Sequence, residues 1–142
     1  MLVPLLLPAG LGVIAYCLLQ AYKGMRRSSV VVRKSRGLYW TDGIINGHTL
    51  TFLVDTGATD IVLNQEAIEL LKPIPHGTDT LSSANGRLEV QWTVVEEIHI
   101  GPLVGRDICA VMVPGAVHNL LGLSFLEKTR FHYRDGNLVL EQ

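Results

Sequence analysis

The sequence predicts an all-β domain, folded as a closed barrel or sandwich with one or two short helices and preceded by one transmembrane helix. Two observations predict the β domain. After residue 37, short runs of apolar and β-branched residues recur, and turn residues separate them. A third observation predicts the helix, because the first 22 residues contain no charged side chain. The 142 residues suffice for one such domain and an appendage.

Residues 1–22 are expected to cross a membrane as a helix. Leu, Val, Ile, Ala and Gly dominate them, and their number meets the roughly 20 residues that a bilayer core requires. Pro4 and Pro8 should leave the first turns irregular, so that the regular helix begins at about Ala9. A cleavable signal peptide is the less favoured alternative, because no Lys or Arg precedes the apolar core and no small-residue cleavage site follows it.

Residues 23–37 are expected to form a basic linker. Half of the 12 basic residues lie between Lys23 and Arg36. These side chains either lie against anionic head groups or remain solvated, and the sequence leaves both possibilities open. Their position after the apolar segment predicts, by the positive-inside rule, a domain in the cytoplasm. The formal net charge of -1 gives no reason to expect a nucleic-acid partner.

The β domain is expected to span residues 38–142 and to begin with a hairpin. Its first two strands, 38–45 and 48–54, flank Asn46-Gly47, which is the strongest two-residue hairpin signal. Asn64 is expected to cap a short helix. The elements that follow the first hairpin are, in order, a strand at 61–63, the helix at 65–71 and a long hairpin formed by 78–83 and 88–100 with Ala84-Asn85-Gly86 at its tip.

The last third of the chain is expected to add two apolar strands, a short helix and a closing hairpin. A turn at Gly101-Pro102 precedes them. Their ranges, in chain order, are 108–113, 117–121, 122–128, 130–134 and 138–140.

The most informative stretch places an acid at the end of a strand. Phe52-Leu53-Val54 runs into Asp55, a small-residue turn of Thr56-Gly57-Ala58 follows, and a second apolar run leaves the turn. An ionised carboxylate avoids apolar surroundings unless it is hydrogen-bonded or paired. A turn Asp that accepts hydrogen bonds from its own backbone is the simplest interpretation of this residue.

The flanking residues favour a functional interpretation instead. The run of apolar residues followed by Asp55-Thr56-Gly57-Ala58 resembles the active-site loop of the retropepsin-like aspartic proteases. About sixty residues later, Asn119 to Leu126, with Leu121-Gly122 at its centre, resembles the second signature of that family. The resemblance covers Leu38 to Gln142. It is closest to the small bacterial branch in which one membrane segment precedes one protease domain.

The resemblance implies the retropepsin-like acid protease fold and an aspartic endopeptidase that cleaves protein or peptide substrates without a cofactor. Its chemistry needs two carboxylates that share one proton. Since the chain contains one Asp-Thr-Gly, Asp55 from two subunits would form the pair across a homodimer with two-fold symmetry. The C-terminal residues 138–142 resemble the strand that interleaves in retroviral dimers, although they could also pair within their own subunit.

The resemblance also implies roles for the neighbouring residues. Thr56 would donate a hydrogen bond to the opposite loop of the dimer, and Gly57 would let the backbone approach the substrate. Ala58 lacks a hydroxyl, which should leave the acid pair less acidic. Leu121 and Gly122 would pack beneath the Asp55 loop.

Two further roles stay open at this stage. Asp60 would either bind a main-chain group of the substrate or brace the loop. Ala84-Asn85-Gly86 would form the tip of a flap that closes over the substrate, with an ordinary core hairpin as the alternative.

Rival functions have weaker support in the sequence. The five His residues lack a ligand-like spacing and Cys109 has no nearby Cys, so neither a metal site nor a cofactor is expected. The alternative function is a catalytically silent, membrane-tethered β domain that dimerises and binds a peptide or protein. The expected location is a bacterial inner membrane, with a single membrane pass. The charge pattern suggests a cytoplasmic protease domain, whereas the resemblance suggests a periplasmic one.

Overall fold

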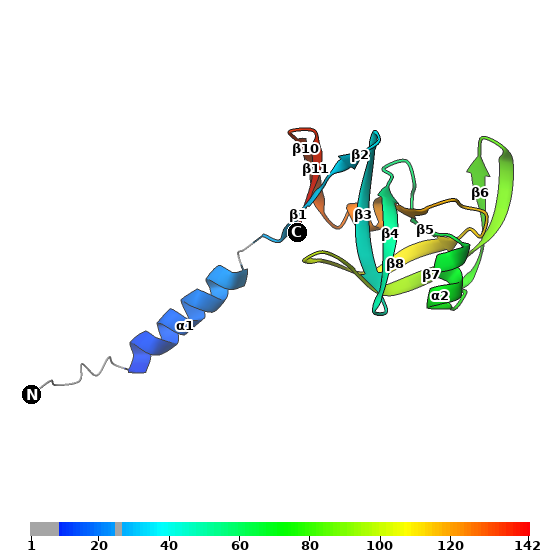
Figure 1. The fold of residues 1–142 in the computed structure, drawn as a ribbon. Coiled ribbons are helices and arrows are strands. Elements are labelled where there is room, and N and C mark those ends of the chain that lie inside the picture. The colour runs from blue at the N-terminus through cyan, green and yellow to red at the C-terminus, as the bar shows by residue number, and fades with distance from the viewer. Residues whose placement is uncertain (1–8, 25–26) are drawn as a thin grey trace, which may run out of the picture.

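The computed structural model describes residues 9–24 and 27–142 (Figure 1). Its first element is the helix α1, Ala9–Gly24, which has 16 residues. Within the described ranges, no helix is both long enough and apolar enough to cross a membrane. The predicted transmembrane segment also includes residues 1–8, which lie outside the described residues, so that segment stays a prediction.

The rest of the described chain forms strands and two short helices. The helices are α2 (Gln65–Leu71) and α3 (Leu123–Leu126). The strands are, in chain order, β1 (Ser29–Val32), β2 (Lys34–Ser35), β3 (Leu38–Ile45), β4 (His48–Val54), β5 (Ile61–Leu63), β6 (Gly77–Ser83), β7 (Gly86–Ile100), β8 (Leu103–Met112), β9 (Asn119–Leu121), β10 (Arg130–Arg134) and β11 (Asn137–Glu141).

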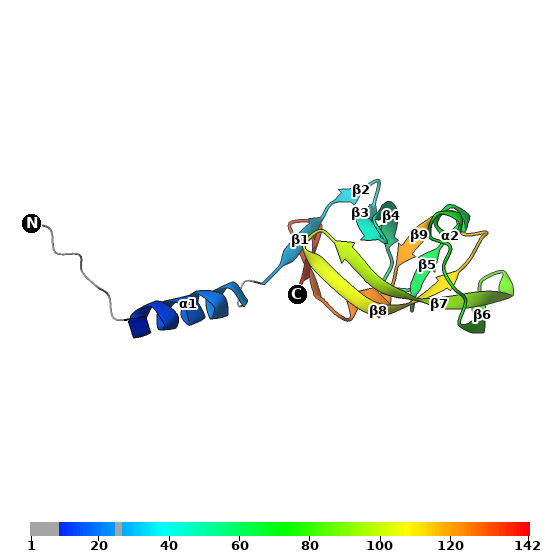
Figure 2. The same ribbon diagram turned by 90° about the horizontal axis from the view of Figure 1, so that it is seen from below.

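These strands form a closed β domain. The larger sheet has the order β2-β3-β4-β9-β5-β8-β7-β6, and pairing of Ile44 and Ile45 in β3 with β7 folds it back on itself. The smaller sheet has the order β1-β11-β10 and lies at the end of the domain where the chain arrives from α1, opposite β6 (Figures 1 and 2). The core between the sheets includes the fully buried Phe52, Phe125 and Leu140.

Most local predictions are confirmed. Asn46 and Gly47 both have positive φ, as the two-residue turn between β3 and β4 requires. The N–H of Ala67 donates to the Asn64 side chain at 3.1 Å, so Asn64 caps α2 as expected.

Strand β8 differs from its predicted range because it starts at Leu103 and not at residue 108. Leu103 pairs with Ile100, and Arg106 pairs with Glu97, so the β7–β8 ladder begins directly after the turn. Asp107 has a φ of +53°, and a polar residue in this conformation interrupts the apolar pattern without ending the strand.

The predicted linker is wrong over its second half. Residues 29–35 are not a tether, because β1 pairs with β11 and β2 pairs with β3. Val32 lies opposite Leu138 and is only 2% exposed, whereas the adjacent Val31 points to the other face and is 55% exposed. Three consecutive valines show no alternation of apolar and polar residues, so the sequence does not indicate a strand. Pairing with β11 determines which valine is buried.

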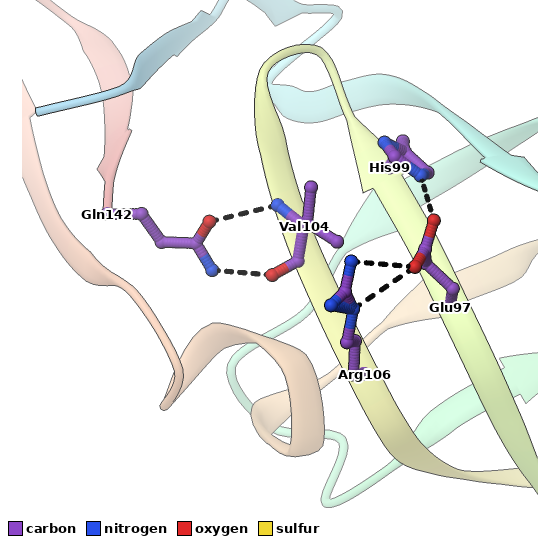
Figure 3. A network of polar contacts seen from close by, with 5 residues as sticks. All are labelled: Glu97, His99, Val104, Arg106 and Gln142. Atoms are coloured by element: carbon purple, nitrogen blue, oxygen red, sulfur yellow. Dashed lines mark hydrogen bonds and ion pairs between the residues drawn. The ribbon is translucent and has the colours of Figure 1, made fainter. Parts of the chain in front are cut away.

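The C-terminal strand pairs within its own subunit. β11 lies between β1 and β10, so both of its edges are occupied. Gln142 then fastens the end of the chain. Its side-chain amide donates to the Val104 carbonyl at 2.7 Å and accepts from the Val104 N–H at 2.9 Å (Figure 3), and its backbone exchanges two hydrogen bonds with Ser28. Ser28 is therefore held against the domain.

The two adjacent valines provide a matched test of the β1 strand. We expect Val32→Ala to lower the free energy of unfolding by about 2 kcal/mol, because it removes buried methyl groups and leaves a cavity. Val31→Ala should change it little, since that side chain is mostly exposed. Urea unfolding of both variants measures the difference. Equal, negligible effects would mean that this segment is a solvated tether after all.

Candidate active site

Asp55 directly follows β4 and is partly buried. β4 runs parallel to β9, with Val54 opposite Leu121, and the N–H of Asp55 donates to the Leu121 carbonyl at 3.1 Å. This hydrogen bond is the last one of the β4–β9 pair, which lies in the interior of the large sheet, and it fixes the position of the Asp55 backbone. Such a position fixes the start of its loop.

The loop after Asp55 wraps around the carboxylate. The N–H of Gly57 donates to Asp55 Oδ1 at 2.8 Å, and the N–H of Ala58 donates to the Asp55 carbonyl at 3.2 Å. A Cβ at Gly57 would lie 3.1 Å from Asp55 Oδ1, which is tighter than ordinary contact. Thr56 is exposed, and its hydroxyl makes no hydrogen bond with any residue that the structure describes.

The second motif lies against the back of this loop. A Cβ at Gly122 would lie 2.2 Å from the Asp60 carbonyl oxygen and 2.7 Å from that of Ala58, so only glycine fits here. Because the backbones approach so closely, the N–H of Leu123 reaches the Ala58 carbonyl at 2.9 Å, and the N–H of Ser124 reaches the Thr59 carbonyl at 2.8 Å. The structure therefore brings Leu121 and Gly122 to the Asp55 loop.

Two polar side chains that brace the loop were missed by sequence reasoning. Ser124 Oγ accepts from the Ile61 N–H at 3.1 Å and donates to the Cys109 carbonyl at 2.9 Å. Asn119 is buried; its Oδ1 accepts from the Asn64 N–H at 2.9 Å, and its Nδ2 donates to the carbonyl of Thr51 in β4 at 3.2 Å. The available signal was their place in an otherwise apolar motif, Asn119 at its start and Ser124 within it, where a polar side chain out of water needs partners.

A pocket of about 360 Å³ opens beside the loop. One wall consists of Gly57 to Asp60, and the opposite wall comes from the β6–β7 hairpin. Apolar side chains dominate the lining, namely Val62, Leu81, Leu88, Val111, Val113 and Leu120.

The hairpin tip itself lies outside this pocket. Ser83 pairs with Gly86, and the N–H of Asn85 donates to Ser83 Oγ at 3.3 Å. Ala84, Asn85 and Gly86 do not line the pocket, whereas Ser82 and Ser83 just below the tip do. The hairpin stands beside the Asp55 loop, with its tip free of the pocket.

Asp60 lies at the wall of the pocket and is partly buried. Burial raises the pKa of its carboxyl above the ordinary value, and the negative charge of Asp79 on β6 raises it further. The Asp55 loop and strand β6 therefore each bring one carboxylate to the same region.

Comparison with known proteins decides the family. The family described as "gag-polyprotein putative aspartyl protease" matches residues 41–128, which is more than half of the chain. The chain belongs to this aspartyl protease family. The matched range contains both the Asp55 loop and the Leu121-Gly122 motif.

A solved structure agrees with this assignment. A retropepsin-like aspartic protease from Rickettsia conorii superposes with a TM-score of 0.72 and 25% sequence identity, over 82% of this chain and 92% of that one. The resemblance to retropepsins that the two motifs suggested is thus confirmed.

A curated relative extends beyond this chain. The "Uncharacterized protein in cobV 5'region" of Sinorhizobium sp. is 36% identical in an alignment of 106 residues that covers 70% of this chain. The chain spans about half of that relative's length, 46%.

This aspartyl protease chain brings only part of the predicted site together. Asp55, Gly57 and Ala58 form one hydrogen-bonded turn, and Leu121 and Gly122 support it from behind. Across the described ranges, no three His, Cys, Asp or Glu residues gather as metal ligands would. One chain thus supplies one braced carboxylate beside an apolar pocket.

Gly122→Ala should disrupt this site, because the new Cβ meets backbone oxygens that cannot move without displacing the loop. We expect it to lower the free energy of unfolding by about 3 kcal/mol. Gly115→Ala is the matched control, since its Cβ would meet nothing within 4 Å. Thermal unfolding and amide NMR shifts of the loop measure the effect. Two variants of equal stability would contradict the close packing described here.

Asp60→Asn should stabilise the protease at neutral pH but not in acid. Below the ordinary Asp pKa of 3.8 the carboxyl is neutral in both the folded and unfolded states, so it contributes nothing. As the pH rises through the raised folded-state pKa, the folded state acquires a charge that burial and Asp79 disfavour. The stability advantage of Asn should therefore appear over that pH interval. Urea unfolding of both proteins across pH checks the sign, and an advantage that is largest in acid would refute it.

Proposed function

We propose that this chain is an aspartic endopeptidase that acts as a homodimer, in which each copy contributes Asp55 to one catalytic pair. The observation that carries the proposal is the placement of a single Asp-Thr-Gly carboxylate on a braced loop beside an apolar pocket. Family membership supports peptide hydrolysis. The presence of one motif per chain supports a partner that supplies the second acid.

The chemistry follows from two carboxylates that cannot both ionise at close range. They share one proton, so one is a base and the other an acid at the same pH. The ionised Asp55 takes a proton from a water molecule between the pair, and that water attacks the scissile carbonyl. The protonated Asp55 of the other copy donates to the carbonyl oxygen. When the C–N bond then breaks, the first Asp55 gives the proton that it took to the leaving nitrogen, and the other Asp55 recovers a proton from a hydroxyl of the hydrated carbonyl.

The exposed Thr56 supports a dimer formed through the loops. Its hydroxyl is adjacent to Asp55 and has no partner among the described residues, so it is available to the loop of a second copy. Interleaving of the C-terminal strands would require β11 to leave β1 or β10. The proposed dimer therefore depends on contacts around the active-site loops and flaps.

The substrate is proposed to be a protein or peptide with an apolar side chain near the cleaved bond. The pocket beside Gly57 has an apolar lining and about 360 Å³ of space, which suits one large side chain. Asp60 at its wall offers a carboxylate to a main-chain N–H of the substrate, and in the free enzyme it bounds the pocket.

We further propose that the N-terminal segment anchors the protease to a membrane, with a single pass. Residues 1–22 are uncharged, and the described side chains of α1 are exposed; Leu18 is 64% exposed and Tyr22 is 67% exposed. A row of uncovered apolar side chains is stable in lipid. Both orientations of the protease domain remain compatible with this anchor.

Asp55→Asn is the decisive variant. We expect it to lower peptide cleavage by about 10³-fold, because an amide cannot carry the shared proton. Asp107→Asn is the matched control, since Asp107 is exposed and Asn tolerates its positive φ. The assay is cleavage of a peptide library by the full chain in detergent, across pH. Full activity of Asp55→Asn, or binding of peptides without cleavage by the wild type, would favour a silent binding module.

Subunit mixing then tests the shared pair. Adding an excess of the Asp55→Asn chain should suppress wild-type cleavage in proportion to the loss of wild-type homodimers, because a mixed dimer has one carboxylate. An excess of Asp107→Asn should not suppress it. Cleavage that is unaffected by the Asp55→Asn chain would show that a solitary subunit is active.

A further inference from the structure

The charges of the described domain are strongly segregated. Residues 37–126 contain three basic and ten acidic side chains, a net charge of -7, whereas residues 27–36 and 127–142 together contain seven basic and three acidic side chains, a net charge of +4. These two short segments meet in the small β1-β11-β10 sheet and the β2–β3 turn. We name the basic end of the domain by its seven basic residues: Arg27, Arg33, Lys34, Arg36, Lys128, Arg130 and Arg134.

Three of these cations surround one pocket. Arg27, Lys128 and Arg130 line a cavity of about 410 Å³, together with Thr129, Gln142 and the carboxylates of Glu127 and Glu141. Across the described residues, none of the seven cations is within salt-bridge distance of an acid; the ion pairs found there both involve Glu97 on β7. The basic end thus has exposed positive charge that the protein does not neutralise.

Aromatic side chains accompany these cations in β10 and at Tyr39. Phe131 and Tyr133 lie between the arginines of β10, and Tyr133 packs against Tyr39 with ring centroids 5.6 Å apart. Lys34 Nζ lies 5.8 Å from the centre of the Tyr39 ring. Aromatic rings beside basic groups are typical of protein surfaces at the membrane–water interface.

The basic end is also the end to which the apolar helix is attached. The backbone and side chain of Gln142 hold Ser28 to the domain, and α1 ends at Gly24, only four residues earlier. Four residues span at most about 14 Å. A bilayer that contains α1 therefore lies close to the pocket of Arg27 and Arg130, while β6 lies at the opposite end of the domain (Figure 2).

We propose that the basic end docks on the anionic surface of the bilayer that holds α1, with lipid phosphates bound by Arg27, Lys128 and Arg130. The proposal rests on the membrane anchor proposed above and adds a second contact, in which the basic end of the protease domain binds the lipid surface. Guanidinium and ammonium groups form charge-assisted hydrogen bonds with phosphate oxygens. Docking would give the domain a defined orientation on the lipid, with the net-negative part of the domain directed away from it.

Hydrogen–deuterium exchange of the full chain in nanodiscs tests whether the basic end contacts lipid. Residues 130–137 form an edge strand and its turn, so contact with lipid should slow the exchange of their amides. We expect slower exchange in nanodiscs that contain phosphatidylglycerol than in nanodiscs of phosphatidylcholine alone. Arg130→Gln combined with Arg134→Gln should weaken docking by about 25-fold, at about fivefold for each charge near the surface. Lys72→Gln combined with Arg87→Gln is the control with an equal loss of charge far from the pocket.

The possible results distinguish docking of the basic end from membrane anchoring by the N-terminal segment and from peptide cleavage. Equal exchange in both kinds of nanodisc, or equal behaviour of the two double variants, would overturn the docking proposal. Slower exchange caused by added duplex DNA in neutral nanodiscs would assign the surface to nucleic acid and overturn it as well.

Failure of the chain to enter neutral nanodiscs would instead contradict the proposal that the N-terminal segment is a membrane anchor. Docking would then be measured by sedimentation with phosphatidylglycerol vesicles, and absence of binding there would overturn it. Peptide cleavage by Arg130→Gln combined with Arg134→Gln in detergent should match the wild type, because neither arginine lies at the active site.

Discussion

The close backbone contact at Gly122 is the constraint on which the active-site loop depends. The carbonyl oxygens of Ala58 and Asp60 occupy the space that any side chain at this position would need. The first N–H groups of a helix have no partner within that helix. Here the N–H groups of Leu123 and Ser124 donate to the carbonyls of Ala58 and Thr59. These two bonds satisfy N–H groups at the start of α3 and carbonyl groups of the loop at once. The loop has little freedom to move independently of the sheet.

This rigidity matters for the proposed chemistry, which needs a second carboxylate at a defined place. A catalytic pair works only if both acids are held at close distance without being neutralised by other groups. Within one chain, Asp55 accepts a hydrogen bond from the Gly57 N–H, and β9 and β5 hold the loop from either side. In the proposed dimer, each copy would therefore arrive with its acid already oriented, and dimerisation would only have to bring two ordered loops together.

Local patterns in the sequence predicted the parts of the fold that depend on neighbouring residues. The Asn46-Gly47 turn, the Asn64 cap and the position of Asp55 at a strand end all follow from short-range chemistry. The second motif was recognised from its resemblance to a family, and its contact with the loop spans more than sixty residues of sequence. The polarity of Ser124 and Asn119 indicated that each needs a partner, but not which one, because each bonds to backbone groups of distant strands.

The error at residues 29–35 has the same origin but a larger consequence. A basic, valine-containing segment is typical of a juxtamembrane tether, and only its pairing with β11 makes it a strand. That pairing shortens the stretch of chain between α1, the proposed anchor, and the β domain. With Ser28 held by Gln142, only three residues, 25–27, separate the end of α1 from the part of the chain that the domain holds, and not the fifteen residues of the predicted linker.

A short connection would restrict which dimer the chain could form if it acts as the membrane-anchored protease proposed above. Two copies anchored from the same side of one bilayer can be related only by a two-fold axis along the membrane normal, because any other two-fold axis would direct one anchor away from the lipid. The paired Asp55 loops must then lie on that axis, with both basic ends facing the lipid at equal height. A domain that is already seated loses less rotational freedom on pairing, and confinement to the bilayer raises its effective concentration. A dimer that is weak in dilute solution would therefore form on the membrane, and the surface density of the chain would set its activity.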